Sequence, residues 1–304
     1  MTASKVLIVS SPKPETSAPA RLLASRLAAV GIEAVVHPLQ DSSPAVSPDA
    51  AAATDSPAPD SPAPETADPE TADFDVSEIA LVVPMGGDGT FLAATRLIDF
   101  APIPLLAFNY GRLAFLAGNP ERDEVELVTD ALAGDIRFER RATLDATVTE
   151  ADGSETRFTA LNEIVYARGA SGQVVEFGYG VSGTSIAHLK ADGLVVATAT
   201  GSTGYALSVG GPVVSPGYAG LVVVPIAPHA LNTRAIVCGP SDVIEVDIDD
   251  ALPGETSVFV DGQTTDISQP AHLQVQRGER EVLFALGGGD FFTNVSRVFF
   301  GSPA

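Results

Sequence analysis

The chain has 304 residues, 45% of them hydrophobic, and its 39 acidic side chains outnumber 17 basic ones to give a formal net charge of −22. This acidity disfavours binding to nucleic acid or to an anionic membrane, because both need a basic protein surface. The single cysteine excludes a disulfide framework, and no apolar run approaches the roughly 18 residues that a membrane helix needs. We therefore expect a cytoplasmic globular protein, with about two domains on length alone.

The acidity also favours a halophilic source, and we expect a halophilic archaeon. Only three of the basic residues are lysines. Carboxylates hold water at high salt and keep a protein soluble there, whereas the apolar stems of lysines do not. The alternative is a mesophilic protein with an acidic linker, because residues 41–75 alone contain nine acidic residues and no basic one. The rest of the chain still carries the remaining −13.

The first elements follow the pattern of an α/β domain. Residues 5–10 predict a buried parallel strand, residues 18–30 a helix that ends at Gly31, and residues 33–37 a second strand. Residues 79–83 predict a third strand, residues 91–99 a helix and residues 104–109 a further strand. Between residues 37 and 79, the segment 41–75 includes tandem copies of DSPAP and ETAD over 55–74. It has too little apolar area to fold, so we expect a disordered insertion.

After about residue 118 the pattern is rich in strands. The segments that predict strands are separated by Gly, Asp and Pro turns and are 143–150, 156–165, 174–181, 193–198, 243–248, 257–260 and 273–276. The Gly-rich segment 178–183 matches the spacing of a dinucleotide-binding loop, but no helical pattern follows it, so it predicts a β-hairpin. The four histidines lie far apart in the sequence, so we expect no metal site among them.

The loop Gly86-Gly87-Asp88-Gly89-Thr90 lies between a predicted buried strand and a helix start. Glycines there let the backbone approach a phosphate, and the N–H groups of the helix start supply donors. A carboxylate repels phosphate, so Asp88 suggests a separate role, either as a general base or as a ligand for a sugar hydroxyl or a cation. Alternatively, Asp88 is the N-cap of an ordinary helix.

Two further clusters carry polar residues. The segment 192–212 combines Asp192 with many glycines and hydroxyl residues, which could form a phosphate or ribose site, or an ordinary turn. Asn162 and Glu163 are adjacent in an otherwise apolar strand. Successive strand residues face opposite sides, so only one of them enters a pocket unless a bulge or strand end intervenes.

Taken together, these segments resemble the NAD kinase family. The match runs in order through the loop 86–90, residues 109–116, Ala160-Leu161-Asn162-Glu163, residues 192–212, residues 224–229 and Val260-Asp261-Gly262-Gln263. The first loop is shared with phosphofructokinases and with lipid kinases, whereas 192–212 is far more specific. Ala114, Ala199 and Gly204 depart from the family's usual Gly, Pro and Ala.

The resemblance implies an α/β N-terminal domain, Rossmann-like and phosphofructokinase-like, over residues 1–118, and a β-rich NAD-binding domain over 119–286. Residues 287–304 would return to the α/β domain. The implied reaction is phosphorylation of the adenosine ribose 2′-hydroxyl of NAD by ATP or polyphosphate, with Mg²⁺ or another divalent cation entering with the donor. The family also implies a homo-oligomer, a dimer or tetramer.

The resemblance also implies roles for individual residues. Asp88 would hold the hydroxyl and accept its proton, while Gly86, Gly87, Gly89 and Thr90 would form the phosphate cradle. The other implied contacts to NAD are Asn162, Glu163, Lys190, Asp192, Thr203, Tyr205, Ser208 and, more weakly, Gln263. A lipid or sugar kinase that shares the first loop, and a non-catalytic NAD-binding regulator, remain as alternatives.

Overall fold

The computed structural model describes residues 5–40, 74–110, 115–116, 122–169, 172–249, 256–287 and 291–301. Its first part is a parallel sheet of order β2-β1-β3-β4, with strands β1 (Lys5–Ser10), β2 (Ala34–Pro38), β3 (Ile79–Gly86) and β4 (Phe108–Asn109). The strands are almost wholly apolar because helices cover both faces. Helix α1 (Pro14–Ala29) packs on one face and α2 (Asp88–Leu97) on the other.

Helix α3 (Glu124–Ala133) follows the α/β sheet and was not predicted. Asp123 caps it by accepting hydrogen bonds from Val125 N and Glu126 N, and Gly134 ends it in the left-handed conformation at φ 80°. Its Leu127 packs in the same core cluster as α1. The domain boundary at residues 118–119 stays a prediction.

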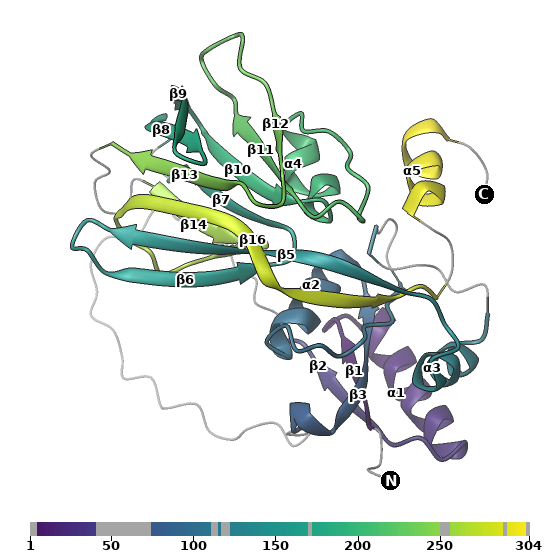
Figure 1. Cartoon of the computed structure of the whole chain (residues 1–304). Helices are drawn as coiled ribbons and strands as arrows, with labels where there is room; N and C mark the ends of the chain where they lie inside the picture. The colour runs from purple at the N-terminus through teal and green to yellow at the C-terminus, as the bar shows by residue number, and fades with distance from the viewer. Residues whose placement is uncertain are drawn as a thin grey trace, which may run out of the picture.

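The second part is a sandwich of two six-stranded sheets, which confirms the predicted β-rich domain (Figure 1). One sheet has the order β12-β11-β10-β7-β14-β15 and the other β6-β5-β16-β13-β8-β9. Their facing side chains, among them Tyr166 and Phe177, form one buried core. The strands are β5 (Phe138–Glu150), β6 (Glu155–Ala160), β7 (Glu163–Arg168), β8 (Val175–Val181), β9 (Thr184–Ala191), β10 (Gly193–Thr198), β11 (Leu221–Ile226), β12 (Ile236–Cys238), β13 (Val243–Ile248), β14 (Thr256–Val260), β15 (Gln263–Thr264) and β16 (Pro270–Ala285).

The predicted hairpin over 178–183 is confirmed. Strands β8 and β9 are antiparallel neighbours joined by the two residues Ser182 and Gly183, which have φ 50° and 78°. Two positive φ values at the centre of a two-residue loop are the geometry of a type I′ turn, whose twist matches that of the strands. This segment therefore does not bind a dinucleotide phosphate as a strand–helix loop.

The predicted single strand 156–165 is wrong, because the chain breaks between β6 and β7 and places them in different sheets. The predicted strand 104–109 is also shorter than expected, since only Phe108–Asn109 pairs continuously. Within that segment, Leu105 instead forms isolated bridges to Val82 on one side and to Phe284 on the other.

These bridges join the two parts of the molecule. The end of β16 runs from the sandwich to the α/β sheet, where Leu105 N donates to Leu283 O and Ala285 N donates to Leu105 O, both at 2.8 Å (Figure 1). Helix α5 (Phe291–Phe300) follows, and the ring of Phe299 stacks on Phe115 at 6.0 Å between centroids. The predicted return of 287–304 to the α/β domain stays a prediction. Among the described helices, none is long and apolar enough to cross a membrane.

The acidic segment 41–75 lies outside the described residues except for its last two. The chain on either side of it comes together, because the His37 ring lies edge-on to Phe74 with 5.7 Å between centroids. A short bridge can therefore join the two flanks.

We predict that replacing residues 42–73 by about eight Gly and Ser residues leaves the free energy of unfolding unchanged or raises it by about 1 kcal/mol, because loop closure depends only weakly on length. Urea unfolding measures this. A Gly/Ser segment of the original length is the control that separates length from composition. A loss of more than about 3 kcal/mol in both variants would contradict the prediction, because it requires buried contacts made by the native segment.

Candidate active site

The loop after β3 forms an open cradle at the start of α2. A Cβ at Gly86 would lie 2.2 Å from Thr90 Oγ1, so the fold itself requires glycine there. Gly87, the N-cap of α2, and Gly89 have no atom within 4 Å of such a Cβ. Their backbones therefore face space that the described residues do not fill, beside the N–H groups of a helix start. This arrangement suits a phosphate group.

Asp88 is the first residue of α2, and its carboxylate faces residues 115–116. Its Oδ2 accepts a hydrogen bond from Phe115 N at 3.1 Å, and its Oδ1 accepts one from Leu116 N at 2.9 Å. The interpretation of Asp88 as an N-cap is therefore wrong, because Gly87 holds that position. Burial raises the pKa of Asp88, and the two N–H donors oppose that shift. Each oxygen keeps a lone pair for a substrate hydroxyl.

Asn162 and Glu163 lie at the break between β6 and β7, and both are buried, with 8% and 6% exposure. The chain is not a continuous strand here, so the side chains of Asn162 and Glu163 are not forced to opposite faces and both can be buried. The Asp261 carboxylate fixes the corner by accepting backbone hydrogen bonds from Leu161 N, Asn162 N and Glu163 N at 3.0, 2.7 and 3.2 Å. Arg96 of α2 lies 3.9 Å from the same carboxylate, so the element that carries Asp88 also contacts this corner.

The corner carries buried polar atoms that lack partners. Among the described residues, Asn162 Oδ1 and Glu163 Oε2 have no hydrogen-bond partner, although the backbone of Tyr205 hydrogen bonds to the Glu163 carboxylate. Burial, and then the negative charge of Asp261, raise the pKa of Glu163 to about 8. Glu163 is therefore mostly protonated at neutral pH. Buried unpaired acceptors are uncommon in native proteins, and together with the raised pKa they mark a place for a ligand.

The Gly-rich segment after β10 packs directly on this corner. Thr198 Oγ1 donates to Leu161 O at 2.6 Å and accepts from Gly201 N at 3.1 Å. A Cβ at Gly201 would lie 2.1 Å from Asn162 O, so only glycine allows this approach. The tight contact brings the short helix α4 (Tyr205–Ser208) beside Glu163.

A cavity of about 540 Å³ opens beside the corner. Three of the sequence-predicted residues line it, namely Glu163, Asp192 and Tyr205. Its apolar walls include Val165, Ala167, Ile226 and Phe259. Apolar walls with a few polar groups, including a carboxyl group of raised pKa, suit a flat heterocycle with attached hydroxyl groups.

The remaining predicted residues lie elsewhere or only at the margin. Lys190 pairs with Glu176 at 2.5 Å on the outer face of the second sheet, and Gln263 lines a different groove, of about 1170 Å³. Thr203 Oγ1 donates to Thr200 O, and Ser208 is exposed at the end of α4. Neither Asp88 nor Asn162 lines the 540 Å³ cavity.

Sequence reasoning gives no role to three residues of the site. Asp261 belongs to one of the matching motifs without a function of its own, and no pattern marks Arg96 or Arg168. Arg168 Nε lies 2.9 Å from Asp192 Oδ1 and orients that carboxylate at the cavity. The sequence did offer a signal for Asp261, because this acidic residue follows an apolar strand and precedes a glycine. It offered no such signal for Arg96 or Arg168.

Comparisons with known proteins find matches over most of the chain. Residues 6–136 match the model of the ATP-NAD kinase N-terminal domain, and residues 161–286 match that of the ATP-NAD kinase C-terminal domain. The NAD kinase of Gemmatimonas aurantiaca is 38% identical over 271 residues, which are 88% of this chain and 90% of that protein. The NAD kinase of Ralstonia nicotianae is 42% identical over 205 residues, 66% of this chain and 67% of that protein.

Two solved structures share the fold. The crystal structure of yeast NADH kinase complexed with NADH aligns with a TM-score of 0.79 and 20% identity over 100% of this chain and 89% of that one. The NAD kinase from Archaeoglobus fulgidus in complex with ATP aligns with a TM-score of 0.70 and 21% identity over 98% and 97%. Both identities are low, so these two matches bear on the fold alone.

We predict that Glu163→Gln stabilises the protein in alkaline conditions. The native pKa of about 8 exceeds the ordinary value of 4.5, so the folded state holds its proton more tightly than the unfolded chain. The stability that this provides is complete below about pH 4.5 and is lost as the pH rises through about 8, by at most about 1.4 kcal/mol per pH unit. Glutamine does not titrate and avoids this loss.

Melting temperatures of both proteins between about pH 5 and pH 9 measure the effect. The difference in favour of Glu163→Gln should grow with pH. The matched control is Glu150→Gln, because hydrogen bonds from Gln269 N and Ser268 N lower the pKa of Glu150. If the melting temperatures of the wild type and Glu163→Gln instead differ by the same amount at every pH in this range, Glu163 is ionised in the native state throughout.

Proposed function

The chain belongs to the NAD kinase family and catalyses phosphoryl transfer to the 2′-hydroxyl of the adenosine ribose of NAD, and from this premise we propose how its residues act. The proposal depends on the carboxylate of Asp88. Asp88 is the first residue of α2, and two backbone N–H groups hold its carboxylate in place. A fixed carboxylate beside a phosphate cradle is what a ribose hydroxyl needs to become a nucleophile.

In the transfer step, Asp88 orients the 2′-hydroxyl and accepts its proton. The freed oxygen forms a bond to the terminal phosphorus of the donor, and the bond from that phosphorus to its bridging oxygen breaks. The leaving group is ADP, or polyphosphate shortened by one unit, and the products are NADP and a proton. Phosphoryl transfer depends mainly on such positioning and on stabilisation of charge.

Donor phosphates are proposed to occupy the open space at Gly87 and Gly89, with Gly86 and Thr90 shaping the turn beneath them. A divalent cation such as Mg²⁺ would arrive bound to these phosphates and would supply neutralisation of their charge. Among the described residues, no three donor atoms of His, Cys, Asp or Glu side chains lie together near Asp88.

NAD is proposed to bind at the corner that Asp261 fixes. The 540 Å³ cavity would take part of the dinucleotide, with Tyr205 and Phe259 against a ring and with Glu163 and Asp192 on polar atoms. Asn162 Oδ1 and Glu163 Oε2 supply buried acceptors, and a protonated Glu163 also supplies a donor. Thr203, Ser208, Lys190 and Gln263 are proposed as outer contacts.

The alternatives fit less well. A lipid or sugar kinase would share only the first loop, whereas the match to the ATP-NAD kinase C-terminal domain covers 161–286. A non-catalytic regulator would not need a carboxylate at Asp88. We further propose that the protein is cytoplasmic, forms a dimer or tetramer, and comes from a halophile.

We predict that Asp88→Asn lowers kcat for NADP formation by about 10²–10⁴-fold, because the amide cannot accept the proton. Coupled assays of NADP from NAD, with ATP and polyphosphate tested separately, measure kcat, and calorimetry measures the affinity for NAD. NAD affinity should stay within about threefold of the wild type, because asparagine keeps the shape of the side chain.

The matched control is Asp123→Asn. Asp123 also accepts two backbone N–H groups, those of Val125 and Glu126, but it caps α3 instead of facing the cradle. This control should keep the wild-type kcat. If Asp88→Asn keeps more than about a tenth of kcat, Asp88 is not the base. If only its NAD affinity falls, Asp88 is a binding residue.

We also predict that the melting temperature falls as KCl is lowered from about 1 M to 0.1 M, where the Debye length grows from about 3 Å to about 10 Å. The excess acidic side chains, which give a net charge of −13 outside the acidic segment, then repel one another over longer distances. An uncharged osmolyte at matched osmolality is the control. Equal melting temperatures across this range would remove the proposed halophilic origin and leave the kinase assignment intact.

A further inference from the structure

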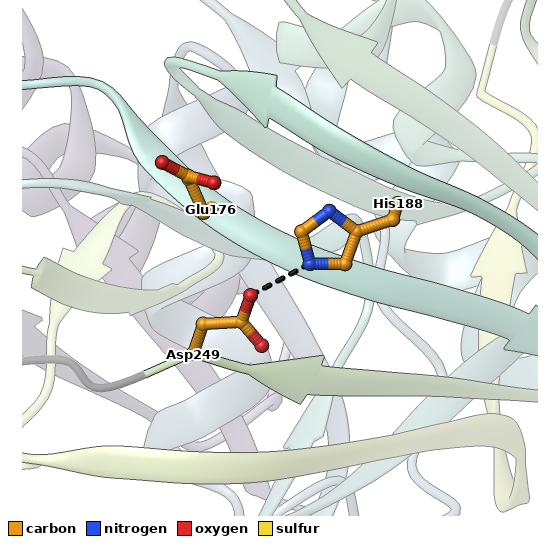
Figure 2. A group of neighbouring side chains, drawn as sticks. All are labelled: Glu176, His188 and Asp249. Carbon is orange, nitrogen blue, oxygen red and sulfur yellow. Dashed lines mark hydrogen bonds and ion pairs between the residues drawn. The ribbon is translucent and has the colours of Figure 1, made fainter.

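The outer face of the second sheet carries a histidine between two carboxylates. In the register of β8 and β9, His188 lies opposite Gly178, and Glu176 lies opposite Lys190. On the other side of β8, Asp249 N donates to Glu176 O at 3.3 Å. Strand pairing therefore brings Glu176, His188 and Asp249 together from adjacent segments of the sheet, and Figure 2 shows their side chains on one side of the ribbon.

The three side chains are close enough to share one ion. One donor atom from each lies within 4.8 Å of the others, and His188 Nε2 is 2.6 Å from Asp249 Oδ2, the dashed line in Figure 2. Gly178, opposite His188, has no side chain, and the His188 side chain is 57% exposed, so an ion can reach the imidazole from solvent. Ligand atoms about 2.1 Å from a tetrahedral ion lie about 3.4 Å from one another. This separation falls between the 2.6 Å of the His188–Asp249 contact and the 4.8 Å within which all three donor atoms lie.

We propose that Glu176, His188 and Asp249 form a surface site for Zn²⁺, with water in the fourth position. The ligand set of one imidazole nitrogen and two carboxylate oxygens suits Zn²⁺, whereas Mg²⁺ and Ca²⁺ prefer oxygen ligands alone. The two carboxylates balance the charge of the ion. This site lies outside the 540 Å³ cavity, whose lining includes none of the three residues.

Lys190 competes with the ion for one ligand. Its Nζ lies 2.5 Å from Glu176 Oε1, so this ammonium group neutralises part of the charge of one ligand and repels Zn²⁺. Zn²⁺ and Lys190 therefore compete for the negative charge of Glu176. If Lys190 contacts NAD, as the proposed function has it, Zn²⁺ weakens the ion pair that holds this side chain.

A second histidine on the same face provides a matched control. His272 Nδ1 lies 2.9 Å from Asp247 Oδ1, but this pair has no third His, Cys, Asp or Glu donor near it among the described residues. His229 is a second control, because its backbone N–H donates to Lys190 O and places it near the site without entering it.

The test is calorimetric titration of the full-length protein with Zn²⁺ alone, repeated with Mg²⁺, without NAD or ATP. His188→Gln and Asp249→Asn should each weaken Zn²⁺ binding by at least about tenfold. His272→Gln and His229→Gln should leave it unchanged, and Lys190→Gln should tighten it. Melting temperatures of the metal-free variants check that all of them fold.

Equal Zn²⁺ affinity in the wild type and His188→Gln would overturn the site. Loss of binding in His272→Gln or His229→Gln would also overturn it, because the ion would then lie elsewhere, and so would Mg²⁺ binding as tight as that of Zn²⁺. These measurements use no turnover, so a failure here is distinct from a failure of the kinase mechanism.

Discussion

The carboxylate of Asp261 holds the corner around which the proposed nucleotide site is arranged. It accepts three successive backbone N–H groups, from Leu161 to Glu163, where the chain leaves one sheet of the sandwich and enters the other. Without it, three buried donors would lack partners, each costing about 1–3 kcal/mol. The same corner receives Thr198 and Gly201 from the Gly-rich segment and approaches Arg96 of α2.

This arrangement also sets the electrostatics of the site. Glu163 and Asp261 are buried and Asp88 is half-buried, and burial raises the pKa of each of these carboxyl groups. Backbone donors offset the shift at Asp88 and Asp261, whereas Glu163 receives less compensation and also faces Asp261. This difference agrees with the proposed roles, in which the hydrogen-bonded carboxylate of Asp88 acts as a base and a protonated Glu163 donates a hydrogen bond to a ligand.

The sequence predicted the order of elements in the α/β domain, the hairpin at 178–183 and the strand-rich second domain, because local periodicity and turn residues determine these features. It misplaced the strand at 156–165, because a tertiary contact from a residue about 100 positions away breaks that strand. The glycine–aspartate loop was visible because its residues are contiguous. Arg96, Arg168 and the grouping of Glu176, His188 and Asp249 were not visible, since strand pairing and helix packing bring them together.

The hydrogen bonds of Leu105 to Leu283 and Ala285 have a consequence for cooperativity. They make the last residues of the sandwich's longest strand the edge of the α/β sheet, so each domain includes part of the other's hydrogen-bonded framework. Unfolding of either domain strips partners from the other, and the two should melt in one transition. Separation of the domains at the α/β end would expose paired backbone groups to water. An opening that keeps these bonds would instead bend the connecting strands, and β16 has an irregular stretch between Arg277 and Glu281 where its pairing with β5 shifts register.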